Sequence, residues 1–166
     1  MTAKSDPVSL LQKNRLLRSP EEVDLFEKAL AAAAVECKLD SLPDLHLVLD
    51  DKCCHYEVMF GLVHLIESFE VELQLTVFLD VLPQLSHQAP DWCRILFFRI
   101  LNDEVARGLL RGLLQRRTDQ SEVVARNILE QIATDEKAPL KDLAGFVLSS
   151  SKTPSGLIED ENEVED

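Results

Sequence analysis

The chain is short of positive charge and of aromatic side chains. Of its 166 residues, 17 are Lys or Arg against 30 Asp or Glu, which gives a formal net charge of −13, and only 5% are aromatic. Such acidity opposes binding to nucleic acid through its phosphates and favours a basic partner. We therefore expect a basic protein partner and no nucleic-acid binding.

Long apolar runs are also missing. No stretch approaches the ~20 apolar residues that a membrane-spanning helix needs, and the first residues, MTAKSDP, contain no apolar segment typical of a secretory signal. The four cysteines form no C-x-x-C pair. We therefore expect reduced thiols, a cytoplasmic location and no membrane association.

Sequence signatures of catalysis are absent as well. There is no glycine-rich phosphate loop, no G-x-S-x-G elbow and no H-E-x-x-H pair. Cys53, Cys54 and His55 are adjacent, but neighbouring helical residues point about 100° apart, so we interpret them as small buried thiols and a core histidine. We expect no metal, no cofactor and no enzymatic activity. The enzymatic alternative is an acid–base pair of Glu57 and His64, which no nucleophile or cofactor motif accompanies.

Apolar residues recur at helical spacing along almost the whole chain, and no convincing strand alternation occurs. Ser19, Pro20 and Glu22 form a strong helix start, with Ser19 as the N-cap and Glu22 completing a capping box. A later helix is expected to begin at a cap formed by Asp119 or Ser121.

A central helix is expected from a cap at Asp50 or Asp51 to about Phe69. On a helical wheel it is apolar over most of its circumference, which predicts that it packs on two sides. Its one polar strip carries Glu57 and His64.

The second half of the chain predicts further short helices. Pro83 is expected to break one of them, because proline removes an interior hydrogen bond. Trp92 lies among apolar neighbours and is expected in the core. Asp103 is expected to cap the helix that follows it. Gly108 and Gly112 lie one turn apart, and their cost in helix propensity suggests a close helix crossing.

About seven or eight helices joined by short links predict an all-α fold of antiparallel helix pairs. We expect a HEAT-like α-solenoid, with a compact helical bundle as the alternative. Residues 1–18 are interpreted as an N-terminal extension, 19–148 as a single helical domain and 149–166 as a disordered acidic tail.

The charge is distributed unevenly along the sequence. Residues 19–93 carry three Lys against fifteen Asp or Glu, a net of −12, whereas residues 94–126 carry seven Arg against four acids, a net of +3. Gathered on one face, the acids of the first half attract a basic partner. The arginines of the second half either form a basic patch or pair with those acids inside the molecule.

Two stretches resemble the bacterial immunity protein 30 family. The first is Asp50-Asp51 followed by residues 55–67 (HYEVMFGLVHLIE), and the second comprises Leu82-Pro83, residues 89–92 (APDW), residues 99–103 (RILND) and Arg107. The resemblance covers roughly residues 45–110. It implies a small cytoplasmic antidote that is encoded beside a polymorphic toxin of contact-dependent or secretion-delivered type.

Charge and resemblance together predict an immunity protein that binds and neutralises a cognate toxin domain, with toxins that attack nucleic acid or nucleotides favoured because their clefts are commonly basic. The alternative is a general HEAT-like scaffold or adaptor. The sequence carries no signal for the oligomeric state. The expected partner-binding residues lie on helix ends and polar strips: Asp50, Asp51, Glu57, His64, Glu67, Glu70, Asn102 and Asp103. For Asp51 and Asp103, helix capping is the competing interpretation.

Overall fold

The computed structural model describes residues 4–149, and every regular element in that range is helical. The elements are α1 (Pro7–Asn14), α2 (Pro20–Glu36), the short 3-10 turn η1 (Leu39–Ser41), α3 (Leu42–His46), α4 (Tyr56–Glu67), α5 (Val71–Gln88), α6 (Pro90–Asn102), α7 (Glu104–Arg116), α8 (Gln120–Asp135) and α9 (Leu140–Leu148). None of the helices in residues 4–149 combines the length and the apolar character needed to cross a membrane.

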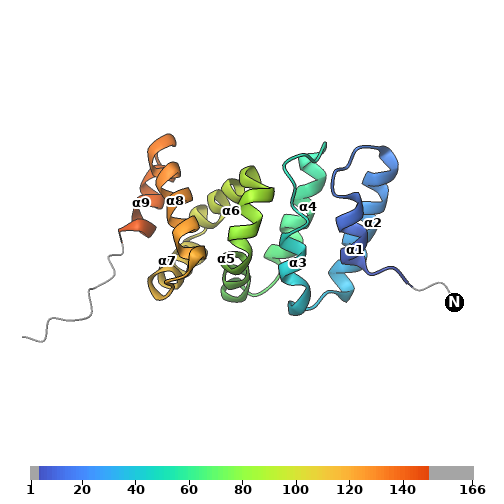
Figure 1. Ribbon diagram of the computed structural model, residues 1–166, viewed down its shortest axis with the longest axis horizontal. Coiled ribbons are helices and arrows are strands. Elements are labelled where there is room, and N and C mark those ends of the chain that lie inside the picture. The colour runs from blue at the N-terminus through green and yellow to red at the C-terminus, as the bar shows by residue number, and fades with distance from the viewer. Residues whose placement is uncertain (1–3, 150–166) are drawn as a thin grey trace, which may run out of the picture.

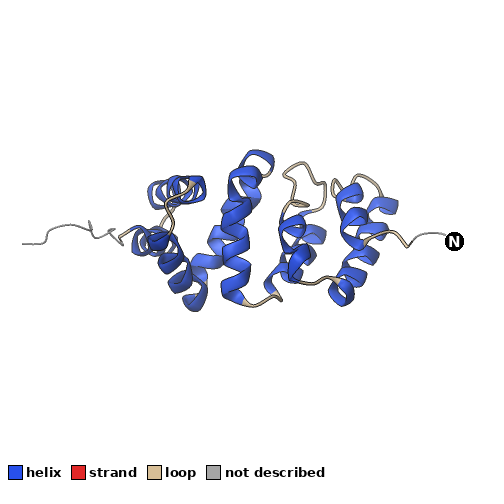
Figure 2. Cartoon of the chain, turned by 60° about the horizontal axis from the view of Figure 1, so that its bottom comes forward, coloured by secondary structure: helices blue, strands red, loops and turns tan. Residues whose placement is uncertain are grey.

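The helices follow one another along the long axis of the molecule (Figure 1). α1 packs on α2 and α3 on α4, while α5 lies between α3 on one side and α8 on the other. α9 closes the far end by packing on α6, α7 and α8. The same row, with loops joining successive helices, is visible in the rotated view (Figure 2). The predicted all-α class is confirmed, and the elongated row favours a solenoid over a compact bundle. The likeness to HEAT repeats in particular stays a prediction.

The predicted N-terminal extension contains a helix, whereas nearly all of the predicted tail lies outside the described residues. α1 lies inside the segment 1–18, which the sequence suggested was an extension, and it packs closely against α2. The predicted disordered tail lies outside the described residues from residue 150 onward.

Local caps start several helices as the sequence predicts. The Ser19 hydroxyl accepts the backbone N–H of Glu22 at 3.2 Å. The Glu22 carboxylate, however, accepts the backbone N–H of Arg18 at 2.8 Å instead of that of Ser19. Asp103 accepts the N–H of Ala106 at 2.8 Å, and Asp119, the predicted alternative to Ser121, accepts that of Glu122 at 3.2 Å. A side-chain oxygen in this position satisfies one of the free donors of a helix start.

The helix expected after Asp50 or Asp51 begins later than predicted. α4 starts at Tyr56, and its N-cap is His55, so neither Asp50 nor Asp51 caps this helix. Residues 47–55 form the connection that leads into it. Pro83 does not break α5, which continues to Gln88 because Leu82 and Leu85, on either side of the proline, are completely buried. Tertiary packing therefore outweighs the lost hydrogen bond.

The close helix crossing lies at a different glycine from those predicted. An added Cβ at Gly61 would come within 2.9 Å of Leu30 Cδ1, so α4 approaches α2 closely at this point. The space over Gly108 and Gly112 is open to at least 4 Å within the described part of the chain. The prediction for these two glycines is wrong, because helix spacing alone does not say which face meets a neighbour.

The core extends along the row of helices. Its bulkiest fully buried side chains are Trp92, Phe26, Phe78 and Phe97, which confirms the core position predicted for Trp92. Phe78 of α5 meets Phe97 of α6 edge-to-face at a centroid distance of 5.3 Å, an arrangement that aromatic pairs favour.

Candidate partner-binding surface

Asp50 is held inside the molecule. Its side chain accepts Arg15 Nε at 3.1 Å and the backbone N–H of Lys52 at 2.9 Å, and only 7% of the residue is exposed. A buried and paired carboxylate is not available to a partner without breaking these bonds. Asp50 therefore supports the scaffold, and its expected role in binding stays a prediction.

Asp51 caps a distant helix. Its carboxylate accepts the backbone N–H groups of Asp91 at 2.9 Å and Trp92 at 3.1 Å, at the start of α6. Burial raises the pKa of Asp51, while the two N–H donors act in the opposite direction. Tyr56 stacks on the Trp92 ring at a centroid distance of 4.7 Å, and the indole N–H donates to the Asp50 carbonyl. The two stretches that carry the family resemblance are thus in direct contact.

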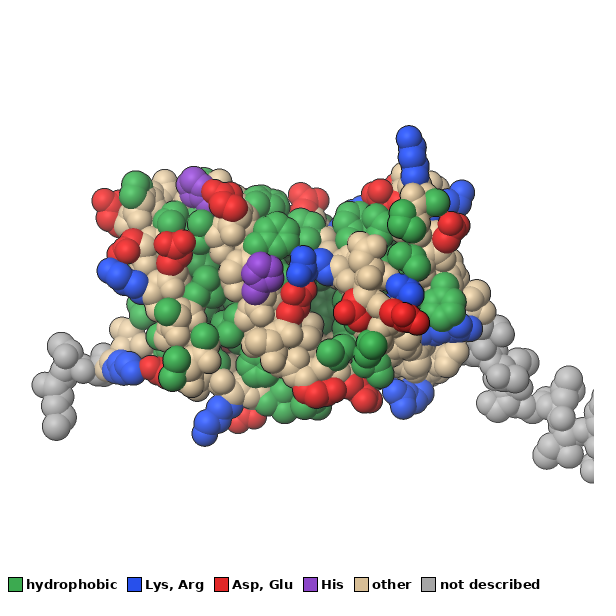
Figure 3. All heavy atoms as spheres, turned by 180° about the vertical axis from the view of Figure 1, so that it is seen from behind, with side chains coloured by type: hydrophobic (Ala, Val, Ile, Leu, Met, Phe, Trp, Pro, Cys, Tyr) green, Lys and Arg blue, Asp and Glu red, His purple; other side chains and the backbone are tan. Residues whose placement is uncertain are grey.

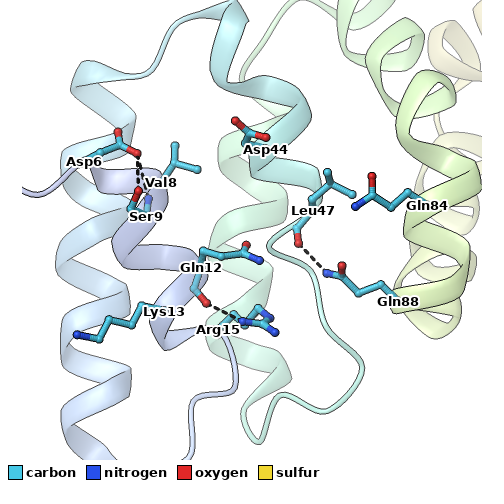
Figure 4. A pocket seen from close by; sticks show the side chains of 10 residues that line it. All are labelled: Asp6, Val8, Ser9, Gln12, Lys13, Arg15, Asp44, Leu47, Gln84 and Gln88. Carbon is cyan, nitrogen blue, oxygen red and sulfur yellow. Dashed lines mark hydrogen bonds between the residues drawn. The ribbon is translucent and has the colours of Figure 1, made fainter.

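Further hydrogen bonds anchor the 47–55 connection beside a groove of about 560 Å³ between α1, α3 and α5 (Figure 4). Gln88 Nε2 donates to the carbonyls of Leu47 at 2.6 Å and Leu49 at 2.8 Å. Arg15, which bonds Asp50 of the connection, also donates from Nη1 to the Gln12 carbonyl of α1 at 2.9 Å. None of the predicted partner-binding residues lines this groove.

A second groove gathers three of the predicted residues. Its volume is about 520 Å³, and Glu67, Asn102 and Asp103 belong to its lining. The complete lining is Glu67, Val71, Gln74, Arg99, Ile100, Asn102, Asp103 and Ala106. We call this space the Arg99 groove. Five of its eight lining residues are polar or charged, and Val71, Ile100 and Ala106 are the apolar ones.

Arg99 and Glu67 form the charged pair of the Arg99 groove. Arg99 Nη2 donates to Glu67 Oε2 at 2.7 Å, and Arg99 Nε donates to the other carboxylate oxygen. The hydrogen bond to Glu67 raises the pKa of the guanidinium. The Arg99 guanidinium also lies over the Phe60 ring, 6.0 Å from its centroid. Arginine beside an aromatic ring is typical of the residues that dominate interface energies.

Glu70 and Asp103 serve as helix caps at exposed positions. Glu70 accepts the N–H groups of Glu72 at 3.1 Å and Leu73 at 2.9 Å at the start of α5. Asp103 starts α7, as its capping interpretation predicted. Because both residues are exposed, each carboxylate still faces solvent.

Glu57 lies apart from the Arg99 groove, beside a third groove of about 430 Å³ between α2 and α4. Asp24, Glu27 and Glu57 line this space together with Arg18, and we call it the acidic groove. Asp24 is paired with Lys28 at 2.7 Å. The Glu57 carboxylate is 74% exposed and bonds His55 Nδ1 at 3.0 Å. Its own backbone N–H and His55 hold the pKa of Glu57 below its usual value. We call the side of the molecule seen in Figure 3 the rear face. Acidic side chains are prominent on it over the N-terminal end of the molecule, at the left of the view.

The enzymatic alternative finds no geometric support. His64 is exposed and forms no hydrogen bond with another residue of the range 4–149, so Glu57 and His64 are not paired. His55 is exposed and not in the core as predicted; the buried histidine is His46. Within residues 4–149, no group of three or more His, Cys, Asp or Glu side chains is placed to hold a metal ion.

The cysteines follow their interpretation only in part. All four are free thiols, and Cys53 and Cys93 are buried. Burial raises the pKa of the Cys93 thiol to about 12. Cys54 is exposed, contrary to the expectation of a buried thiol.

Five of the seven arginines in residues 94–126 pair with acids, and three of these pair with acids of the first half. Arg99 bonds Glu67, Arg117 bonds Asp80, and Arg116 lies 3.9 Å from Glu72. Intramolecular pairing is therefore the alternative that the structure favours. Many carboxylates outside the acidic groove are thus paired with arginines or cap helices, and they do not form one continuous acidic patch with it. In the view from behind, acidic and basic side chains are mixed over much of the surface (Figure 3).

Comparison with sequence families gives a match to Immunity protein 30 over residues 13–110, which is more than half of the chain. The chain belongs to the Immunity protein 30 family. The matched range contains every residue that lines the Arg99 groove and the acidic groove, whereas α8 and α9 lie beyond it. No curated protein and no solved structure matches the chain.

The prediction missed Arg99 in this Immunity protein 30 chain. Arg99 begins the quoted stretch RILND, so a signal was present in the sequence. Its importance depends on the contact with Glu67, which lies 32 positions earlier and which helix spacing does not reveal.

Proposed function

We propose that this chain binds a cognate bacterial toxin domain in the cytoplasm and neutralises it. Membership of the Immunity protein 30 family is the observation that carries the proposal. Four free thiols are in keeping with a reducing compartment. The toxin is of the polymorphic or contact-dependent type, and a domain that attacks nucleic acid or nucleotides fits best, because it presents a basic cleft.

The proposed contact surface is the rear face between the acidic groove and the Arg99 groove. Glu27 and Glu57 attract a basic domain and raise its association rate. Arg99 and Phe60 supply a half-buried anchor, because tight binding depends on a few well-packed side chains more than on net charge. Glu67, Asn102 and Asp103 line the same surface and keep their expected role.

The chain acts by occupying the toxin and not by catalysis. Occupation requires only a complementary surface, and the Glu57 carboxylate that bonds His55 is 74% exposed, so the pair is not shielded from water. Because Asp50 and Asp51 hold the scaffold, they support binding only indirectly, by fixing the 47–55 connection to Arg15 and to the start of α6.

Co-expression with the adjacent reading frame tests this proposal. We expect the neighbouring product to arrest growth, this chain to restore growth, and the two proteins to purify together. Reversing charge with Glu27→Lys and Glu57→Lys should slow association about tenfold or more at low salt and flatten its salt dependence.

The matched control carries the same change of charge at exposed acids outside the family match, Glu130→Lys with Asp142→Lys. It should associate nearly as fast as the unchanged chain. If the adjacent product is harmless and does not bind, the antidote proposal fails, and a scaffold with several partners becomes the better interpretation. Equal slowing by both double variants would contradict the role of the acidic groove.

A further inference from the structure

Apart from the contact of Arg111 with α9, the outer face of α7 is uncovered within residues 4–149. At 100° per residue, Glu104, Val105, Gly108, Arg111 and Gly112 fall within an arc of about 120°. The opposite side of α7 is buried in the core through Ala106, Leu110, Leu113 and Leu114. Val105 is 65% exposed, and nothing lies within 4 Å of a Cβ built on Gly108 or Gly112. The face therefore has a protruding valine next to a recess above two glycines.

Opposite charges stand at the two ends of this face. Within residues 4–149, neither Glu104 nor Arg111 has an oppositely charged group within 4 Å. The Arg111 guanidinium lies over the Phe146 ring of α9, 4.4 Å from its centroid, and Phe146 is itself 43% exposed. The ring contact holds the cation at the surface, where it is available to a carboxylate from outside.

We propose that a second copy of this chain docks on this face, with its α7 antiparallel to the first. A two-fold axis midway between residues 104 and 111 passes beside Gly108 and puts Glu104 of each copy opposite Arg111 of the other. Each of these residues lies about 5 Å from the axis along the helix, since α-helices rise 1.5 Å per residue. Val105 of each copy then points at the recess above Gly108 and Gly112 of the other copy.

Both charge and shape are thus self-complementary, which is the requirement for a two-fold interface. The surface is small, because one exposed helix face and the neighbouring Phe146 form it. We therefore expect a weak dimer whose population depends on concentration, at the low end of specific interfaces. This inference is independent of toxin binding.

Sedimentation velocity of the full chain over a range of concentrations tests the dimer. We expect a monomer–dimer equilibrium that weakens as salt is added. Glu104→Arg or Arg111→Glu alone should raise the dimer Kd about tenfold, because both symmetric ion pairs become repulsive. The two changes together should restore the original Kd.

Gly108→Gln provides a steric test that does not harm the fold. The space above Gly108 is open, and glutamine forms helices better than glycine, so the monomer should remain folded while the dimer is lost. Val105→Gln should weaken the dimer, whereas Val35→Gln, at an exposed valine of α2, should not.

Two results would overturn the proposal. One is a chain that stays monomeric at every concentration. The other is a dimer whose Kd is unchanged by Gly108→Gln and by either charge reversal.

Discussion

The Asp51 carboxylate accepts the Trp92 backbone N–H at 3.1 Å although 41 positions separate the two residues in the sequence. A helix cap normally comes from the residue just before the helix. The residue before α6 is Ala89, whose methyl side chain cannot accept a hydrogen bond. Asp51 of the 47–55 connection supplies the acceptor in its place. The bond ties α6 to the segment that leads into α4.

Replacement of Asp51 should therefore destabilise the fold. Asp51→Ala removes an acceptor from two N–H groups, one of them on a fully buried tryptophan, and we expect a loss of about 1–3 kcal/mol in the free energy of unfolding. Asp103→Ala, which removes a single N–H bond of an exposed cap, should cost less. Urea unfolding of the two variants measures the difference. Unchanged stability of Asp51→Ala together with lost toxin binding would restore Asp51 to the contact surface.

Alanine at Gly108 should stabilise the protein. The added methyl group meets nothing within 4 Å, so the gain in helix propensity is about 0.5–1 kcal/mol. Alanine at Gly61 has the same propensity gain but must displace Leu30 Cδ1, and we expect a smaller gain or a loss. Thermal unfolding at a concentration where the chain is monomeric compares the two. A larger increase in Tm for Gly61→Ala would contradict the close approach of α4 to α2.

Stability should fall as the pH drops below about 6.5, because His46 is buried in its neutral form. Burial lowers the pKa of His46 to about 4, and its Nδ1 bonds the Leu42 carbonyl at 2.8 Å beside Phe78. The unfolded chain takes up a proton near pH 6.5, whereas the folded chain does not until about pH 4. The resulting loss is roughly 2 kcal/mol at pH 5 and stops growing below the folded pKa.

Unfolding curves of the unchanged chain and of His46→Phe across this pH range measure the effect. The phenylalanine variant is expected to be less stable at neutral pH, because it loses the bond to Leu42, but its stability should vary less between pH 7 and pH 5. Parallel curves for the two proteins would show that His46 is not responsible.

Arg99→Ala should weaken toxin binding much more than it weakens the fold. The side chain is partly exposed, so its pair with Glu67 contributes about 1 kcal/mol or less to stability. As an anchor beside Phe60, its removal should raise the toxin Kd about tenfold or more. Arg116→Ala, at an exposed arginine 3.9 Å from Glu72, is the matched control and should bind almost normally. Equal Kd values for the two variants would exclude Arg99 as an anchor.

Sequence reasoning succeeded where a contact is local. Ser19, Asp103 and Asp119 bond to N–H groups three positions ahead, so their spacing in the sequence is enough to predict the cap. Helical periodicity likewise predicted the all-α class, since each helix buries a stripe that is visible in the sequence.

It failed where the outcome depends on which elements meet. The sequence does not indicate that Asp51 lies at the start of α6, or that Arg99 meets Glu67. The net charge of residues 19–93 did not reveal where their carboxylates lie, because the Asp51 cap and the Arg117–Asp80 pair join residues far apart in the sequence. Of the eight predicted residues, the Arg99 groove contains Glu67, Asn102 and Asp103, and Glu57 lies at the other groove.

The stretch that matches the family is shorter than the helical domain that packs around one core. The family match ends at residue 110, within α7, yet Leu129 and Ile132 of α8 are completely buried and α8 packs along α5. A polypeptide cut at residue 110 would expose the apolar flank of α5 and leave α7 unfinished. We therefore expect a chain truncated to the matched residues to fold poorly and to be degraded or bound by chaperones in the cell.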